Sequence, residues 1–125
     1  MIDAFSYETF TTRNIGFVTP DEQRRLRAAR VFICGVGGMG GAALMALARA
    51  GVGRFVIADM DAFDVSNLNR QVFASAATIG KLKAASSAEA VRQINPEIDI
   101  EVHGGEWPKL AGDIAARCDL VINGM

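Results

Sequence analysis

One glycine-rich stretch decides the fold of this chain: Gly35-Val36-Gly37-Gly38-Met39-Gly40-Gly41. It follows a short apolar run at 31–34 and precedes an alanine- and leucine-rich run at 42–50. This order predicts a strand, a tight turn and a buried helix. Glycine at the first, third and sixth positions of this stretch, between a strand and a helix, is typical of a turn that brings the backbone close to a phosphate group. Unpaired amides at the start of the helix attract that negative charge, so the turn predicts a nucleotide-binding domain.

The segments around this turn predict an α/β fold, Rossmann-like and doubly wound, with a mainly parallel sheet. Gly51 and Gly53 end the first helix, and a second apolar strand at 55–58 ends in Asp59. Residues 59–77 are polar and predict a long loop with at most one helical turn. The segments that follow predict a helix, a half-exposed strand and an amphipathic helix, at 81–94, 98–103 and 107–117.

The last run, 119–125, predicts a buried strand. Because a parallel strand is normally followed by a crossover, we expect the domain to be truncated at its C-terminus. The nucleotide-binding domain would then cover 30–125, preceded by an N-terminal arm and helix at 1–29. In that arm, Thr19-Pro20-Asp21-Glu22 combines a capping threonine with proline at the first helical position and a reciprocal glutamate. This pattern predicts a helix that runs to about Ala29.

Composition narrows the class of protein. The 125 residues, 50% of them hydrophobic, are enough for one domain with a buried core. The 13 basic and 14 acidic residues nearly cancel, which argues against a general nucleic-acid-binding surface. Cys34 and Cys118 form no C-x-x-C pair, His103 has no second ligand candidate nearby, and no apolar run approaches the ~20 residues that span a bilayer. We therefore expect a cytoplasmic protein without a membrane segment or a zinc site.

The polar residues after the second strand bear on which nucleotide is bound. Asp59 follows Gly40 by about 20 residues, the spacing at which a carboxylate accepts hydrogen bonds from ribose hydroxyls. These features alone would suit a dinucleotide such as NAD. The chain then adds Asn67, Arg70 and Lys83, and a triphosphate needs fixed cations beyond the turn more than a pyrophosphate does. The sequence therefore favours ATP. An NAD-dependent oxidoreductase domain is the alternative, and either cation singly is more often a solvated surface charge.

Several segments together resemble the ThiF/MoeB/HesA family, the bacterial relatives of ubiquitin-activating enzymes. The most specific is Ser66-Asn67-Leu68-Asn69-Arg70-Gln71 with Lys83 beyond it. The matching segments occur in the same order as in the family, from about Arg13 to Ile122. Its other parts are the glycine turn, Arg13-Asn14-Ile15-Gly16, Ala50-Gly51-Val52-Gly53, Asp59-Met60-Asp61 and Gly80-Lys81-Leu82-Lys83-Ala84.

The resemblance implies an ATP-dependent adenylyltransferase that activates a carboxylate as an acyl-adenylate. Asp59 resembles the aspartate that binds ribose, and Asn67 and Arg70 resemble a pair that contacts the phosphates. Lys83 resembles the lysine that stabilises the α-phosphate as pyrophosphate leaves. Arg13 resembles an arginine that reaches the neighbouring subunit's ATP site, which implies a homodimer. The catalytic set implied is Arg70, Lys83 and Arg13, and the nucleotide-binding set is Gly35, Gly37, Gly38, Gly40, Asp59, Asp61, Asn67, Arg70 and Lys83.

The same resemblance implies Mg²⁺ beside ATP and a carboxylate substrate. In the family that carboxylate is often the C-terminal glycine of a ubiquitin-like or sulfur-carrier protein, while other members use other carboxylates or a modified tRNA. This chain departs from the pattern because Asn123-Gly124-Met125 replaces the usual magnesium aspartate, and no cysteine is positioned as a thioester nucleophile. A non-catalytic nucleotide-binding dimerisation module is therefore a further alternative. We expect Asp61 and Gln71 mainly to shape the loop.

Overall fold

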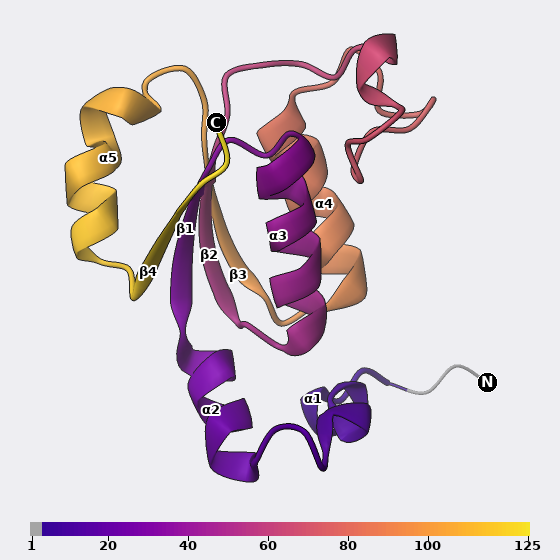
Figure 1. Cartoon of the computed structure of the whole chain (residues 1–125), viewed down its shortest axis with the longest axis vertical. Coiled ribbons are helices and arrows are strands. Elements are labelled where there is room, and N and C mark those ends of the chain that lie inside the picture. The colour runs from indigo at the N-terminus through magenta and orange to yellow at the C-terminus, as the bar shows by residue number, and fades with distance from the viewer. Residues whose placement is uncertain (1–3) are drawn as a thin grey trace.

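The computed structural model describes residues 4–125, which form a four-stranded sheet with helices on both faces (Figure 1). The strand order is β3-β2-β1-β4 and every pairing is parallel. Helices α3 and α4 cover one face, and α5 covers the other (Figure 1). The prediction of a doubly wound, Rossmann-like fold is confirmed. The elements are β1 (Arg30–Cys34), α3 (Gly38–Ala50), β2 (Arg54–Ala58), α4 (Lys83–Ile94), β3 (Asp99–His103), α5 (Trp107–Ala116) and β4 (Leu120–Asn123).

Alternation along the central strands divides the core between the two faces of the sheet. Val31 and Ile33 of β1 point toward α3 and α4, where they pack with Leu44. Phe32, between them, points the other way and packs with Ile114 of α5. Successive side chains of a strand face opposite sides, so a strand covered by helices on both sides is apolar throughout. This explains the unbroken apolar run that precedes the glycine turn.

Helix α3 begins inside the glycine-rich stretch. Gly37 is its N-cap, and the Gly41 N–H donates to the Gly37 carbonyl at 3.0 Å. The start predicted at Ala42 was therefore wrong, because the last glycines of the run already form helical hydrogen bonds. The end was predicted correctly: Gly51 closes the helix with φ of 107°, a left-handed conformation that glycine adopts without strain.

The N-terminal segment contains α1 (Tyr7–Phe10), the single 3-10 turn η1 (Thr12–Asn14) and α2 (Pro20–Ala28). The predicted cap of α2 is confirmed. The Glu22 N–H donates to Thr19 Oγ1 at 3.1 Å, and the Thr19 N–H donates to Glu22 Oε1 at 2.9 Å. Figure 1 shows that this segment lies at the end of the sheet where β1 begins, opposite the end that carries the glycine turn.

The N-terminal segment is held against the C-terminal end of α3. Tyr7 Oη donates to the Gly51 carbonyl at 2.6 Å and accepts from Gln23 Nε2 at 2.9 Å. The Ala50 carbonyl accepts from Gln23 Nε2 at 3.0 Å and from Asn14 Nδ2 at 3.2 Å. The carbonyls that end an α-helix have no partner within it, so these side chains complete the hydrogen bonding of α3.

The start of α4 and the burial of β4 differ from the sequence prediction. Helix α4 begins at Lys83 instead of Lys81, because Leu82 is an extended N-cap residue. Strand β4 was expected to be buried, yet Leu120 and Val121 are 51% and 46% exposed. The expectation was wrong because, in the part of the chain that the structure describes, β4 pairs with β1 alone and lies at the edge of the sheet.

The segment between β2 and α4 is the predicted long loop, and its one helical element is the 3-10 turn η2 (Val65–Asn67). It crosses the end of the sheet near the start of α3 (Figure 1). Within residues 4–125 no helix has the length and hydrophobicity required to cross a membrane.

Candidate nucleotide-binding site

The glycine turn after β1 leaves no room for side chains at its centre. Gly35 has φ of 86°, which an L side chain rarely adopts. A Cβ on Gly40 would lie 1.6 Å from the Gly35 carbonyl oxygen. Gly124, which follows β4, packs into the same place, because its own Cβ would lie 2.6 Å from that oxygen. Sequence reasoning missed Gly124. Its position directly after a strand could have indicated it, because the carboxyl ends of parallel strands lie at the same edge of the sheet.

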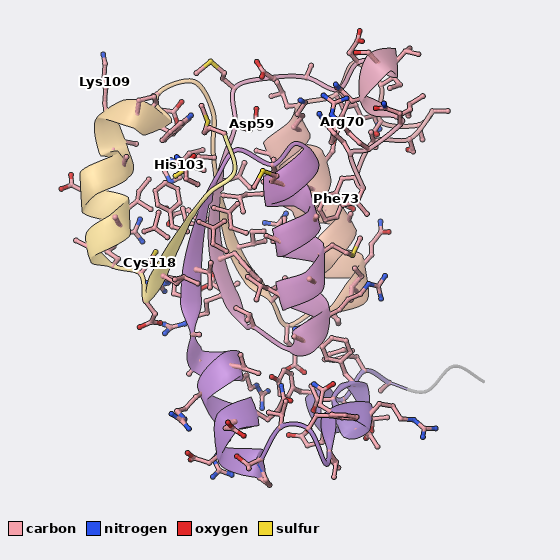
Figure 2. The ribbon with its side chains drawn as sticks, viewed as in Figure 1. Asp59, Arg70, Phe73, His103, Lys109 and Cys118 are labelled. Carbon is pink, nitrogen blue, oxygen red and sulfur yellow. The ribbon has the colours of Figure 1, made fainter. Side chains whose placement is uncertain are left out.

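Asp59 holds the turn in shape from the end of β2. Its Oδ2 accepts from the Val36 N–H at 2.9 Å, and its Oδ1 accepts from the Asp61 N–H at 2.8 Å. A carboxylate has about four lone-pair sites, so both oxygens can still accept a further hydrogen bond. Asp59 and Arg70 lie on either side of the start of α3 (Figure 2). The structure therefore brings the predicted ribose-binding aspartate beside the glycine turn.

The side chains of Arg70 and Gln71 lie over the first residues of α3. The Arg70 side chain passes 3.9 Å from where a Cβ on Gly38 would be, and Gln71 Nε2 lies 3.3 Å from the equivalent point on Gly37. Among residues 4–125, the Arg70 guanidinium donates only to uncharged oxygens, the Ser66 carbonyl at 3.3 Å and Asn69 Oδ1 at 3.0 Å. Its positive charge is thus available to an anion at the helix N-terminus, where the helix dipole adds to it.

Lys83 is buried, with 8% of its surface exposed. Its Nζ lies 5.9 Å from the centre of the Phe63 ring, and within residues 4–125 no carboxylate is within ion-pair distance of it. The Lys83 N–H donates to the Asp61 carbonyl at 2.9 Å, which joins the start of α4 to the segment just after Asp59. Burying an unpaired charge is costly, and such a group is a marker of a functional site.

Asp61 and Asn67 both shape the crossover segment. The Asp61 backbone links Asp59 to Lys83, while its side chain is exposed. Asn67 Oδ1 accepts from the Asp64 N–H at 2.8 Å and so holds the turn η2. This bond uses the carbonyl oxygen of the Asn67 amide. The NH₂ group remains, and it can donate a hydrogen bond to an anion.

The structure does not bring Arg13 to the glycine turn. Arg13 is exposed in η1, next to Asn14, which contacts the C-terminal end of α3. The 13 residues of α3 span about 20 Å, so Arg13 and the glycine turn lie near opposite ends of that helix.

The contacts of His103 and the burial of the two cysteines indicate structural roles. His103 lies between the sheet and α5 (Figure 2), with Nε2 2.6 Å from Glu101 Oε2. Arg117, which donates to Glu101 at 2.9 Å, and His103 lower the pKa of the Glu101 carboxyl. Burial raises the pKa of the Cys34 and Cys118 thiols, so both are poor nucleophiles at neutral pH.

The described residues do not make up a metal centre. Among residues 4–125 no three His, Cys, Asp or Glu side chains are placed to hold a metal ion. At the end of β4 stands the amide of Asn123, whose Oδ1 accepts from the Met125 N–H at 3.1 Å, in place of a carboxylate. This set does not fit a carboxylate-held Mg²⁺.

A parallel sheet, a glycine turn and unpaired cations define a nucleotide-binding domain, and comparison with known proteins specifies its family. The chain belongs to the ThiF family, whose model matches residues 11–125. It is 42% identical over 105 residues to the probable adenylyltransferase/sulfurtransferase MoeZ of Mycobacterium tuberculosis, covering 83% of this chain and 27% of that protein. It is 45% identical over 84 residues to the tRNA threonylcarbamoyladenosine dehydratase of Haemophilus influenzae, covering 67% and 32%.

Among solved structures, the chain is similar to the E. coli tRNA N6-threonylcarbamoyladenosine dehydratase in complex with ATP. The TM-score is 0.88 at 28% sequence identity, over 100% of this chain and 52% of that one. The chain thus spans about half of that structure, and about a quarter to a third of the curated relatives.

Proposed function

We propose that the chain binds ATP at the glycine turn and that its protein transfers AMP to a carboxylate. A carboxylate oxygen attacks the α-phosphorus, the bond from that phosphorus to the bridging oxygen breaks, and pyrophosphate leaves. Negative charge builds up on the phosphates as this happens. The observation that carries the proposal is the buried Lys83 without a carboxylate partner, in a site that also holds Arg70 and the free amides of α3. Fixed positive groups of this kind stabilise such a transition state.

Electrostatics favours ATP over a dinucleotide as the ligand. The helix amides alone can offset much of the charge of a pyrophosphate, whereas a triphosphate carries more negative charge and needs the two further cations, Arg70 and Lys83. Asp59 would hold the ribose, and Asn67 would assist at the phosphates. Mg²⁺ would enter the site together with ATP, bound by the phosphates.

The substrate carboxylate is proposed first to be the C-terminus of a ubiquitin-like or sulfur-carrier protein. The similarity to an adenylyltransferase/sulfurtransferase over 83% of the chain supports this choice. A modified tRNA is the second candidate, supported by the similarity of the whole chain to a tRNA dehydratase. AMP transfer to a carrier protein in the absence of tRNA would favour the first, and ATP cleavage that needs modified tRNA would favour the second.

We also propose a cytoplasmic homodimer in which Arg13 acts across the interface. Arg13 is exposed and lies near the far end of α3 from its own glycine turn, so only a second subunit could bring it to a site. Arg13→Ala should then lower activity without dissociating the dimer. Mixing it with inactive Lys83→Ala should restore part of the activity, because a mixed dimer has one site with both cations. Mixed dimers as inactive as either parent would contradict action in trans.

The experiment that tests the proposed reaction is ATP–pyrophosphate exchange in the intact protein, with the carboxylate substrate supplied. Lys83→Ala should reduce exchange on the order of 10²-fold while changing ATP affinity much less, because its charge matters most in the transition state. Lys109→Ala, an exposed lysine on α5, is the matched control and should leave exchange unchanged (Figure 2). Exchange unaffected by Lys83→Ala would contradict the assigned role. ATP binding without any exchange in the wild type would favour a non-catalytic dimerisation module.

A further inference from the structure

Gln71 is a buried polar residue whose burial the domain itself does not explain. It is 6% exposed, and neither Oε1, which is fully enclosed, nor Nε2 has a hydrogen-bond partner among the described residues. A buried amide oxygen left unpaired lowers the stability of the folded state. Leucine or methionine would fill a similar volume without that cost. The amide group therefore needs a reason other than packing.

The surroundings of Gln71 direct its amide to the start of α3. Its backbone is fixed in the crossover, where its N–H donates to the Asn67 carbonyl and its own carbonyl accepts from the Ala74 N–H, both at 2.9 Å. The nitrogen Nε2 lies 3.3 Å from where a Cβ on Gly37 would be, closer than Oε1 at 3.8 Å. Gly37 is the N-cap of α3, so the NH₂ group lies where the helix amides have no partner within the helix.

We propose that Gln71 is a nucleotide-binding residue: its side-chain NH₂ donates a hydrogen bond to a phosphate oxygen held at the start of α3. The inference rests on the proposed function, since it requires a phosphate at the glycine turn. Gln71 and Arg70 then act as a pair, because their side chains cover Gly37 and Gly38 respectively. Arg70 supplies charge, and Gln71 supplies a directed neutral donor that positions the phosphate against the turn.

The test compares two variants of Gln71 in this chain by calorimetric titration with ATP and with adenosine. Gln71→Leu keeps the packing and removes the donor, so ATP should bind about tenfold more weakly. Gln71→Glu adds a negative charge of the same shape and should weaken ATP further. Adenosine has no phosphate, so its affinity should change less than about twofold in both variants. Gln93→Glu, an exposed glutamine on α4, is the matched control and should bind ATP as the wild type does.

Thermal unfolding separates a binding role from a structural one. If Gln71 serves the nucleotide, Gln71→Leu removes an unpaired buried oxygen, and its Tm should equal or exceed that of the wild type. A folded Gln71→Leu with unchanged ATP affinity would overturn the inference and leave the proposed function intact. A lower Tm together with equal losses of ATP and adenosine binding would assign Gln71 to structure instead. A wild-type chain that binds adenosine but gains nothing from the phosphates of ATP would overturn the proposed function as well.

Discussion

The two ends of helix α3 differ in how their polar neighbours are satisfied. At the C-terminal end, Tyr7 and Gln23 close the last carbonyls with hydrogen bonds of 2.6 and 3.0 Å. At the N-terminal end, the Gln71 amide beside Gly37 makes no side-chain hydrogen bond within residues 4–125, and Lys83, joined through Asp61 to the segment after Asp59, is buried without a carboxylate. Within one helix, satisfied polar groups mark the structural end and unsatisfied ones mark the end that awaits a ligand. This contrast explains why the fold tolerates costly groups at the glycine turn.

The largest effect should come from breaking the backbone at the N-terminal end of α3. Gly40→Ala places a methyl group 1.6 Å from the Gly35 carbonyl oxygen, so the turn must open. We expect a loss of stability of about 3 kcal/mol or more in chemical denaturation, with loss of nucleotide binding. Gly112→Ala, in a helix with open space around it, is the control and should stabilise the chain by up to about 1 kcal/mol. A stable Gly40→Ala chain would show that the turn is not rigid.

The next effect concerns Asp59, which joins the turn to the ribose in the proposed complex. Asp59→Ala should weaken ATP binding by about 1–3 kcal/mol, because it removes a charged acceptor from the ribose and the support of the Val36 N–H. Titration calorimetry measures this, with the exposed Asp113→Ala as control. Equal affinity of wild type and Asp59→Ala would place the ribose elsewhere.

The C-terminal end of α3 should respond in the opposite way. Tyr7→Phe leaves the Gly51 carbonyl without its 2.6 Å donor, which should cost about 1–2 kcal/mol of stability. ATP affinity should not change, because the hydroxyl lies near the other end of the helix. Urea denaturation and calorimetry on the same samples test both parts. A comparable loss of ATP affinity would mean that the two ends are coupled.

The smallest effect is a pH dependence on the far face of the sheet. Arg117 and His103 lower the pKa of Glu101 below the ordinary value of 4.5. Stability from this carboxylate is therefore complete above about pH 4.5 and is lost as the pH falls through the lowered pKa. Because Glu101 is 42% exposed, the contribution should be below about 1 kcal/mol. Glu101→Gln should flatten the acid limb of the stability curve, while Glu89→Gln should not, and identical curves would remove the assigned contribution.

Local patterns in the sequence predicted much of this fold. The apolar run at 31–34, the cap at Thr19 and the stop at Gly51 depend on neighbouring residues only, and the structure confirms them. The start of α3 was missed because a glycine run does not show where helical hydrogen bonding begins. The exposure of β4 was missed because it depends on which strand lies beside it.

The site residues likewise divide into those that the sequence could indicate and those that depend on folding. Asp59, Arg70 and Lys83 could be selected because each stands at a recognisable position along the chain. Gly124 and the amide of Gln71 could not, because they come to lie beside Gly35 and Gly37 only when the chain folds. Arg13 was selected by resemblance alone, and its role in trans stays a prediction.

In the proposed function, Arg70 over the start of α3 and the buried Lys83 make the glycine turn an ATP site. The most direct measurement is calorimetric titration of the chain with ATP and with NAD, followed by displacement of one by the other. We expect ATP to bind more tightly, NAD not to displace it at equal concentration, and Arg70→Ala to remove most of the preference. NAD binding as tightly as ATP, with no effect of Arg70→Ala on the ratio, would contradict this assignment.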